Sequence, residues 1–341
     1  MKLKKRIFIL PGLIIAIAVI VFFSFMKKIE HFADQNINLS QELIFTVPAG
    51  TGRTGLQALL TQYKLIEDSQ LLPWLLRFKP ELAKFKAGTY RLQKGMSLKS
   101  VLQLFASGKE TQFAIRFVEG SRFSDWAKIL QNAPYLKHEI ENKTPKDLLD
   151  ALGMKEGESL EGWFYPDTYL YTAGTSDVEL LKRAHNKMKT VVGQEWESRE
   201  KNLPYDSAYE MLIMASIIEK ETAIESERTK VASVFVNRLR LKMKLQTDPT
   251  VIYGLGDKYT GTIFRSNLNT FTPYNTYMID GVPPTPISMP GLASIKAAAH
   301  PAVTEYLYFV ANGDGGHTFT TNLVAHNKAV SLYRQRLKQD K

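Results

Sequence analysis

The most regular hydrophobic pattern in the chain is an uncharged run of twenty residues, Ile7 to Met26, which reads IFILPGLIIAIAVIVFFSFM. A helix of this length spans a hydrocarbon core of roughly 30 Å. The run is longer than the ~7–15-residue apolar region of a signal peptide, and no A-x-A-like site follows it. We therefore expect an uncleaved transmembrane helix over residues 7–26, with a cleaved signal peptide as the alternative.

The charges around this helix predict its orientation. MKLKKR on the short N-terminal side favours a cytoplasmic tail at residues 1–6, because basic residues stay on the cytoplasmic side. The polar stretch 27–42 then reads as a spacer. Everything after it is expected outside the membrane.

Beyond the spacer, three segments share one pattern of a short strand, a glycine turn and a helix. Each has an apolar residue three positions before a glycine and then apolar residues at helical spacing. The glycine supplies the sharp turn between the two elements. The three strand-turn segments are Phe45–Gly50, Tyr90–Gly95 and Ile115–Gly120.

Later apolar spacing predicts two longer helices. Residues 177–192 are amphipathic with the helical period. Ser207 and Glu210 have the spacing of a capping box, which marks a helix start. Residues 211–218 (MLIMASII) are apolar on every side, so this second helix is expected to be buried.

These elements predict an α+β protein with two domains after the anchor. Residues 43–110 are expected to form a small β-α-α-β subdomain. Residues 111–341 are expected to form a larger α+β domain that carries the chemistry. The middle segment, YRLQKGMSLKSVLQLF, resembles the core of a LysM module, which binds glycans containing GlcNAc, although an ordinary strand-turn-helix scaffold fits the same pattern.

Charge and composition narrow the function. The net charge of +10 owes much to six basic residues among the first 28, which leave 38 basic and 34 acidic residues, or +4, in the rest of the chain. That excess is too small to argue for nucleic-acid binding. With no cysteine, disulfides, thiolate metal sites and a cysteine nucleophile are excluded.

Several common catalytic motifs are missing from the sequence. There is no G-x-G-x-x-G or P-loop motif for nucleotides, no H-E-x-x-H for zinc, and no G-x-S-x-G for a serine nucleophile. We therefore expect neither a metal nor a cofactor.

The apolar helix ends in two glutamates whose faces differ. Glu219 shares a face with small residues, among them Ser216, which leaves room for a ligand. Glu221 lies about 200° away on a bulkier face. From spacing alone we favour a solvated Glu219 where the helix surfaces, with a catalytic Glu219 as the alternative. We expect Glu221 to pair with an arginine such as Arg228 or Arg238.

A series of longer motifs resembles the YceG-like family of endolytic murein transglycosylases. The resemblance runs in order from about Phe45 to the C-terminus and includes the anchor. The motifs are LEGWFYPDTY (160–169), ASIIEKET (215–222), VASVFVNRL (231–239), LQTDPTVIYG (245–254), YNTY (274–277), GVPPTPI (281–287), YFVA (308–311) and GGH (315–317).

The resemblance implies a single-pass protein of the inner (cytoplasmic) membrane, with a LysM-like subdomain and a periplasmic catalytic domain. The implied reaction cuts the MurNAc-β-1,4-GlcNAc bond within a peptidoglycan strand and leaves a 1,6-anhydroMurNAc end. The catalytic glutamate of the ASIIEKET motif is placed at Glu219. Peptidoglycan synthases are the implied partners, with a role in terminating or trimming nascent strands.

This chemistry requires one carboxyl group, because the C6 hydroxyl of the substrate is the nucleophile. Glu219 would protonate the glycosidic oxygen and then deprotonate that hydroxyl. Amide, hydroxyl and aromatic side chains in the matched motifs are candidates for holding sugars, while about half of them are equally explained as core or loop-fixing residues. The candidates for substrate binding are Ser216, Gln246, Asp248, Tyr253, Tyr274, Asn275 and Tyr277.

Three alternatives stay open at this point. Glu161 or Asp167 is a candidate second carboxylate near Glu219. A muramidase-type hydrolase would use water in place of the C6 hydroxyl, with Asp248 assisting. A non-catalytic scaffold would bind peptidoglycan and recruit a synthase without needing Glu219.

Overall fold

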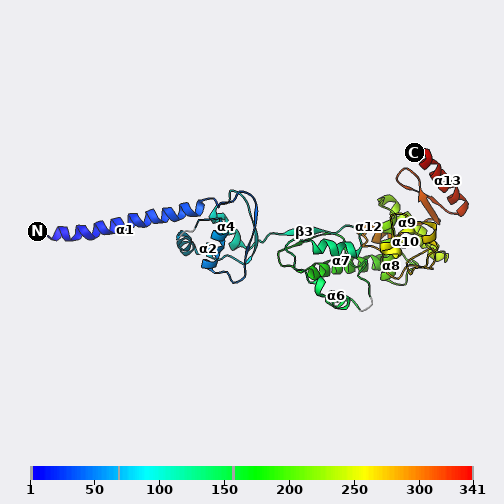
Figure 1. Ribbon diagram of the computed structural model, residues 1–341, viewed down its shortest axis with the longest axis horizontal. Helices are drawn as coiled ribbons and strands as arrows, with labels where there is room; N and C mark the ends of the chain where they lie inside the picture. Colours follow the sequence, from blue (N-terminus) through cyan, green and yellow to red (C-terminus); the bar gives the residue numbers. More distant parts are fainter. Residues whose placement is uncertain (1–2, 68–69, 156–157, 340–341) are drawn as a thin grey trace. The chain divides into compact units, whose positions relative to one another are not determined.

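The computed structural model describes residues 3–67, 70–155 and 158–339, and the chain divides into two compact units after Phe113 (Figure 1). The described elements are mixed helices and strands, with the strands in three two-stranded sheets. The α+β fold class is confirmed.

The first unit is built around one antiparallel strand pair. Its elements are α1 (Leu3–Asp34), β1 (Leu43–Val47), α2 (Arg53–Gln62), α3 (Leu71–Phe78), η1 (Pro80–Ala83), β2 (Gly88–Leu92) and α4 (Leu98–Ser107). Leu43 pairs with Leu92, and Val47 pairs with Gly88. Helices α2, α3 and α4 bury their leucines in a common core, and the elements follow one another in the order β1-α2-α3-η1-β2-α4. The relation to LysM modules stays a prediction.

Helix α1 continues from an exposed apolar segment into this core. Gly12–Asp34 is long and apolar enough to cross a membrane, as a signal sequence also would be, and little of its most apolar window is buried. Its last turns are buried, however, with Ile29 and Ala33 packed in the core. Any membrane span is therefore rigidly joined to unit 1.

The three predicted strand-turn-helix segments are present. The glycine after each strand, Gly50, Gly95 and Gly120, has a positive φ of 79°, 85° and 74°. The first two lead into α2 and α4 of the first unit, and the third leads from β3 into α5 of the second. The left-handed backbone that each turn needs explains why glycine stands there.

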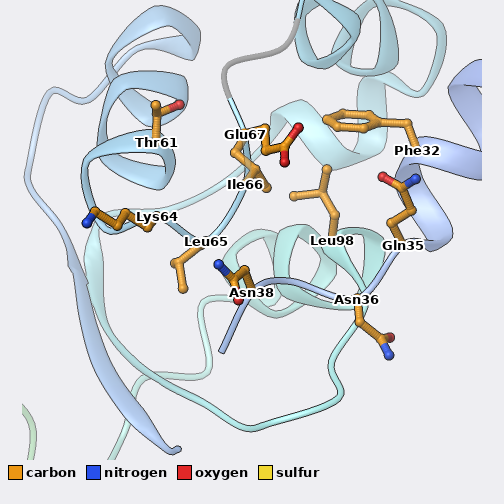
Figure 2. Close-up of a pocket in the computed structure, with 10 residues that line it drawn as sticks. All are labelled: Phe32, Gln35, Asn36, Asn38, Thr61, Lys64, Leu65, Ile66, Glu67 and Leu98. Carbon is orange, nitrogen blue, oxygen red and sulfur yellow. The ribbon is translucent and has the colours of Figure 1, made fainter. Parts of the chain in front are cut away.

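Unit 1 also contains a hollow of about 790 Å³ beside the end of α1. Leu65 and Leu98 supply buried apolar surface, and Gln35 and Glu67 reach toward the same space (Figure 2). The Thr61 hydroxyl is buried there with no hydrogen-bond partner among the described residues. Such a site suits a polar ligand, but nothing in the structure selects one.

The second unit surrounds helix α8, which carries both glutamates. Its elements are β3 (Phe113–Arg116), α5 (Phe123–Gln131), η2 (Ile140–Asn142), α6 (Pro145–Leu152), β4 (Thr168–Tyr171), α7 (Asp177–Ser198), α8 (Ala208–Glu221), α9 (Glu225–Arg240), α10 (Asp248–Leu255), η3 (Gly256–Lys258), α11 (Arg265–Leu268), α12 (Leu292–Ala299), β5 (Tyr308–Ala311), β6 (His317–Thr320) and α13 (Leu323–Gln339). Helices α7, α9, α10 and α12 all contact α8 (Figure 1). The predicted helices at 177–192 and from residue 208 are confirmed.

Candidate active site

Helix α8 begins and is buried as its sequence predicts. The Ser207 hydroxyl accepts a hydrogen bond from the Glu210 amide at 3.2 Å and caps the helix. Every residue from Met211 to Ile218 is buried. The side chains become partly exposed only in the last turn, at Glu219 and Glu221.

Ser216 fastens a loop to the middle of this helix. Its hydroxyl donates to the Ile213 carbonyl at 2.7 Å and accepts from the Ile287 amide at 3.0 Å. The Ser288 hydroxyl donates to the Ser216 carbonyl at 3.1 Å. Because Ser216 is fully buried, its geometry fits positioning of the 286–291 loop better than direct contact with a ligand.

Glu219 faces that loop rather than an open groove. One of its carboxylate oxygens accepts a hydrogen bond from the Gly291 amide at 3.0 Å, at the start of α12. The Gly120 turn lies against the same side chain, and the Lys220 ammonium donates to the Gly120 carbonyl at 3.1 Å.

Glu119 is an acidic neighbour of Glu219. Burial raises the pKa of Glu119, and the negative charge of Glu219 raises it further. Its carboxyl lies directly over Gly291, where an added Cβ would meet it at 2.0 Å. Glu219 is thus a partly exposed residue at the junction between the β3–α5 turn and the start of α12.

Glu221 has a different environment. Its carboxylate accepts a hydrogen bond from the Thr247 hydroxyl. Burial, with a further contribution from the charge of Asp248, raises its pKa from 4.5 to about 7. A carboxyl group in this state keeps a proton near neutral pH, as a general acid must.

The ion pair expected between Glu221 and an arginine does not form within the described part of the chain. Arg238 instead donates to the carbonyls of Leu307 at 2.7 Å and Leu245 at 3.0 Å. It thereby ties the start of β5 to the loop before α10. The neutral hydroxyl of Thr247 leaves the pKa of Glu221 high, whereas an arginine would have lowered it.

A groove of about 420 Å³ opens at Glu221. Three of the predicted substrate-binding residues gather in it, namely Gln246, Asp248 and Tyr277. The full set of residues that line it is Glu221, Phe235, Arg238, Leu245, Gln246, Asp248, Tyr277, Tyr308, Phe309, Leu323, His326 and Asn327.

The polar residues of the groove are held in place. The Tyr277 hydroxyl donates to Asp248 at 2.7 Å, and Arg238 donates to the Gln246 side-chain oxygen at 3.3 Å. Gln246 has a φ of +52°, an uncommon conformation for a residue with a side chain. Such strain is found at functional sites, and here it directs an exposed amide into the groove.

Tyr308 and His326 are among the aromatic residues of the groove that were not predicted as site residues. Tyr308 stacks on His326, with ring centroids 5.1 Å apart. Burial lowers the pKa of His326, so its ring is neutral, and its buried Nδ1 has no partner among the described residues. The YFVA motif gave a signal for Tyr308, whereas His326 had none because it lies after the last matched motif.

The predicted residues Tyr253 and Tyr274 belong to a second location. Their rings are 4.7 Å apart, and the Tyr253 hydroxyl donates to Glu161 at 3.2 Å. Burial raises the pKa of Glu161 to about 7. Tyr253 and Glu161 line a separate pocket of about 570 Å³ together with Arg122, whose guanidinium lies 4.9 Å from the Tyr253 ring centroid.

The remaining candidates have local partners. The amide of Asn275 is buried and donates to the carbonyls of Asn267, Leu268 and Thr270, so it clamps its own loop. Asp167 forms an exposed ion pair with Lys187 at 2.5 Å.

An acid with a raised pKa, in a groove of amide, carboxylate and aromatic side chains, fits one class of protein. Enzymes that cleave glycosidic bonds combine such an acid with groups that hold sugar rings. In keeping with this class, the chain belongs to the YceG-like family, whose model matches residues 45–332.

Named relatives extend this result. The endolytic murein transglycosylase of Bacillus subtilis (strain 168) is 31% identical over 91% of this chain and 88% of its own length. The endolytic murein transglycosylase of Streptococcus pneumoniae serotype 2 is 24% identical over 88% of this chain and 60% of its own length. The crystal structure of the yceG-like protein lmo1499 from Listeria monocytogenes has a TM-score of 0.56 and 28% identity, covering 85% of this chain and 99% of that one.

Proposed function

We propose that the chain is an endolytic peptidoglycan lytic transglycosylase that cleaves MurNAc-β-1,4-GlcNAc bonds and leaves 1,6-anhydroMurNAc ends. Family membership and the names of the two relatives support the reaction class. The observation that carries the proposal is Glu221, whose pKa of about 7 and place in the groove suit an acid that acts on a bound glycan.

The geometry favours Glu221 over Glu219 as the acid/base. Glu221 lines the same groove as Gln246, Asp248 and Tyr277, whereas Glu219 accepts a hydrogen bond from the Gly291 amide at the junction with the start of α12. Glu219 remains the candidate that the sequence indicates, and the experiment below separates the two.

The reaction would proceed in two proton transfers on one carboxyl group. Protonated Glu221 gives its proton to the glycosidic oxygen as the bond from that oxygen to C1 of MurNAc breaks. The resulting carboxylate takes the proton of the C6 hydroxyl as O6 bonds to C1, which restores Glu221 and consumes no water. Asp248, fixed by Tyr277, supplies negative charge beside the positive charge that develops at C1.

A muramidase-type hydrolase is the second candidate, because Asp248 places another carboxylate in the groove of Glu221. In that case water would replace the C6 hydroxyl. The products differ by one water, about 18 Da, so mass spectrometry of digested strands separates the two reactions.

The test is a matched pair of variants, Glu221→Gln and Glu219→Gln, which make the same chemical change two residues apart. We expect Glu221→Gln to lower the rate of anhydro-end formation by at least about a hundredfold, and Glu219→Gln to lower it less than about tenfold. The reverse order would return the catalytic role to Glu219. Full activity in both variants would exclude both glutamates as the acid, whereas a wild type that forms no anhydro ends would favour a peptidoglycan-binding scaffold.

We further propose that α1 anchors the chain in the cytoplasmic membrane with a cytoplasmic N-terminus and the catalytic unit outside. The length and apolarity of Gly12–Asp34 and the basic residues before it support this topology. An anchored enzyme would act on strands close to the membrane, where synthases extend them, and would thereby terminate or trim nascent glycan. Protease accessibility in intact spheroplasts tests the topology, since a protected catalytic unit would contradict it.

A further inference from the structure

Helix α3 of unit 1 has two apolar faces, one buried in the core and the other only partly covered. Leu72, Leu75 and Leu76 lie in the core of the unit. On the other side Trp74 and Phe78 are 44% and 38% exposed. Large aromatic rings left in the open next to one another usually mark a contact surface.

The exposed rings contact the apolar part of α1. Trp74 lies 5.8 Å from Phe25, and Phe78 lies 6.4 Å from Phe22, between ring centroids. Phe22 belongs to the uncharged run that ends before Lys27, about 7 Å farther along the helix axis. If α1 crosses a membrane, Phe78 therefore reaches the edge of the hydrocarbon layer and Trp74 lies just above it.

The charged residues beside these rings point to the polar side of such a boundary. Lys79 follows Phe78 directly, and its ammonium extends to Glu30 of α1 at 3.0 Å, past the end of the apolar run. Lysines at a membrane border direct their charge away from the hydrocarbon in this way. Tryptophan is itself enriched at this depth.

A small pocket beside Trp74 has the chemistry of a phosphate site. It measures about 360 Å³ and is lined by Arg53 and Arg77, among other residues of α2 and α3. Within the described part of the chain neither guanidinium has a carboxylate partner. Two guanidinium groups without a carboxylate partner favour a phosphate group. Each guanidinium can donate two parallel N–H hydrogen bonds to the phosphate oxygens.

We propose that the face formed by Pro73, Trp74, Arg77 and Phe78 lies in the interface of the membrane that α1 crosses. The pocket with Arg53 and Arg77 holds the phosphate of an anionic phospholipid. The inference rests on the proposed anchor and is independent of the enzymatic reaction. It means that unit 1 is fixed on the bilayer surface at two places, by α1 and by α3.

The test uses the full chain in phosphatidylcholine vesicles that contain phosphatidylglycerol and brominated acyl chains, which quench nearby tryptophans. We expect part of the tryptophan emission to be quenched. Trp74→Phe keeps an apolar ring but removes the fluorophore, so it should abolish the quenched part. Trp196→Phe, a change in the second unit, should leave it intact.

A second arm tests the pocket. In vesicles without phosphatidylglycerol the quenching of Trp74 should fall by about half or more, because the arginines lose their anionic ligand. Arg53→Gln combined with Arg77→Gln should give the same low quenching in both kinds of vesicle.

The inference is overturned if the chain floats with the vesicles but Trp74→Phe does not change the quenching. It is also overturned if phosphatidylglycerol has no effect on the wild type. A chain that does not float with vesicles would refute the anchor and this inference together, while the proposed reaction would be unaffected.

Discussion

Glu219 and Glu221 lie two residues apart at the end of α8, yet their surroundings differ. Glu219 accepts a hydrogen bond from the Gly291 amide at the start of α12. Burial beside Asp248 raises the pKa of Glu221 to about 7, which stabilises the protonated form. Two carboxyl groups of one helical turn therefore meet different partners.

The raised pKa predicts the pH dependence of the reaction. The first step needs protonated Glu221, and the protonated fraction falls as the pH rises through about 7. We expect kcat/KM to fall about tenfold for each pH unit above that value, because this ratio reports the ligand-free enzyme. Rates of anhydro-end formation at low substrate concentration between about pH 5 and about pH 9 measure it. A kcat/KM that stays level well above neutrality would exclude Glu221 as the acid.

The same shift predicts that Glu221→Gln stabilises the protein. The folded chain binds the proton more tightly than the unfolded chain, because the pKa rises from 4.5 to about 7 on folding. Wild-type stability therefore falls as the pH rises between these values and stays lowered above them.

At about pH 8 we expect Glu221→Gln to raise the free energy of unfolding by about 1–2 kcal/mol, less than the full shift implies because the group is partly exposed. At about pH 4 the two proteins should be equally stable. Denaturant titrations at the two pH values measure this difference, and a variant less stable than wild type at both would contradict it.

At the scale of elements, the site depends on loops that cross over α8. The 286–291 loop is fastened by Ser216 and pairs with the β3–α5 turn, since the Gly120 amide donates to Met289 at 2.8 Å. It also packs against the LEGWFYPDTY segment, where Gly162 lies against Pro286. These contacts hold the 286–291 loop at the Glu219 side of the end of α8, and the groove lies at the Glu221 side.

Gly162→Ala is expected to disturb this arrangement. Gly162 has a φ of +83°, and an added Cβ would lie 2.3 Å from Pro286. Gly174 has the same φ but nothing within 4 Å, which makes Gly174→Ala a matched control. Both variants incur backbone strain of about 1 kcal/mol, and only Gly162→Ala adds the clash, about 1–3 kcal/mol more. If denaturant unfolding shows that Gly162→Ala and Gly174→Ala lose the same stability, Pro286 moves aside at no measurable cost.

At the scale of the whole molecule, α1 serves both as the proposed anchor and as part of the core of unit 1. Ile29 and Ala33 are 1% and 0% exposed. A chain that begins at Lys28 keeps both residues, whereas one that begins at Gln35 loses them. We expect the first to retain a folded unit 1 and the second to lose about 2–4 kcal/mol of its stability.

Circular dichroism melts of the two truncated chains measure this effect. The chain that begins at Lys28 should unfold at the higher temperature. The chain that begins at Gln35 should bind more of a dye that reports exposed apolar surface. If both melt alike, the packing of Ile29 and Ala33 contributes little to unit 1.

The sequence by itself predicted most of the local structure, because local structure follows from spacing. The apolar run of α1, the turns at Gly50, Gly95 and Gly120, and the Ser207 cap of α8 are all dictated by residues within a few positions of one another. The YceG-like motifs supplied the family and the prediction that the chemistry lies at the end of α8.

Only the tertiary structure distinguishes the two glutamates. A helical wheel gives the angle of each side chain, but it does not show what packs at that angle. The 286–291 loop and α12, 70 or so residues away in sequence, close over Glu219, while α9, α10 and α13 leave a groove at Glu221. Contacts with segments distant in sequence decide both the hydrogen bond of Glu219 and the burial of Glu221. The spacing of residues along α8 gives no information about either.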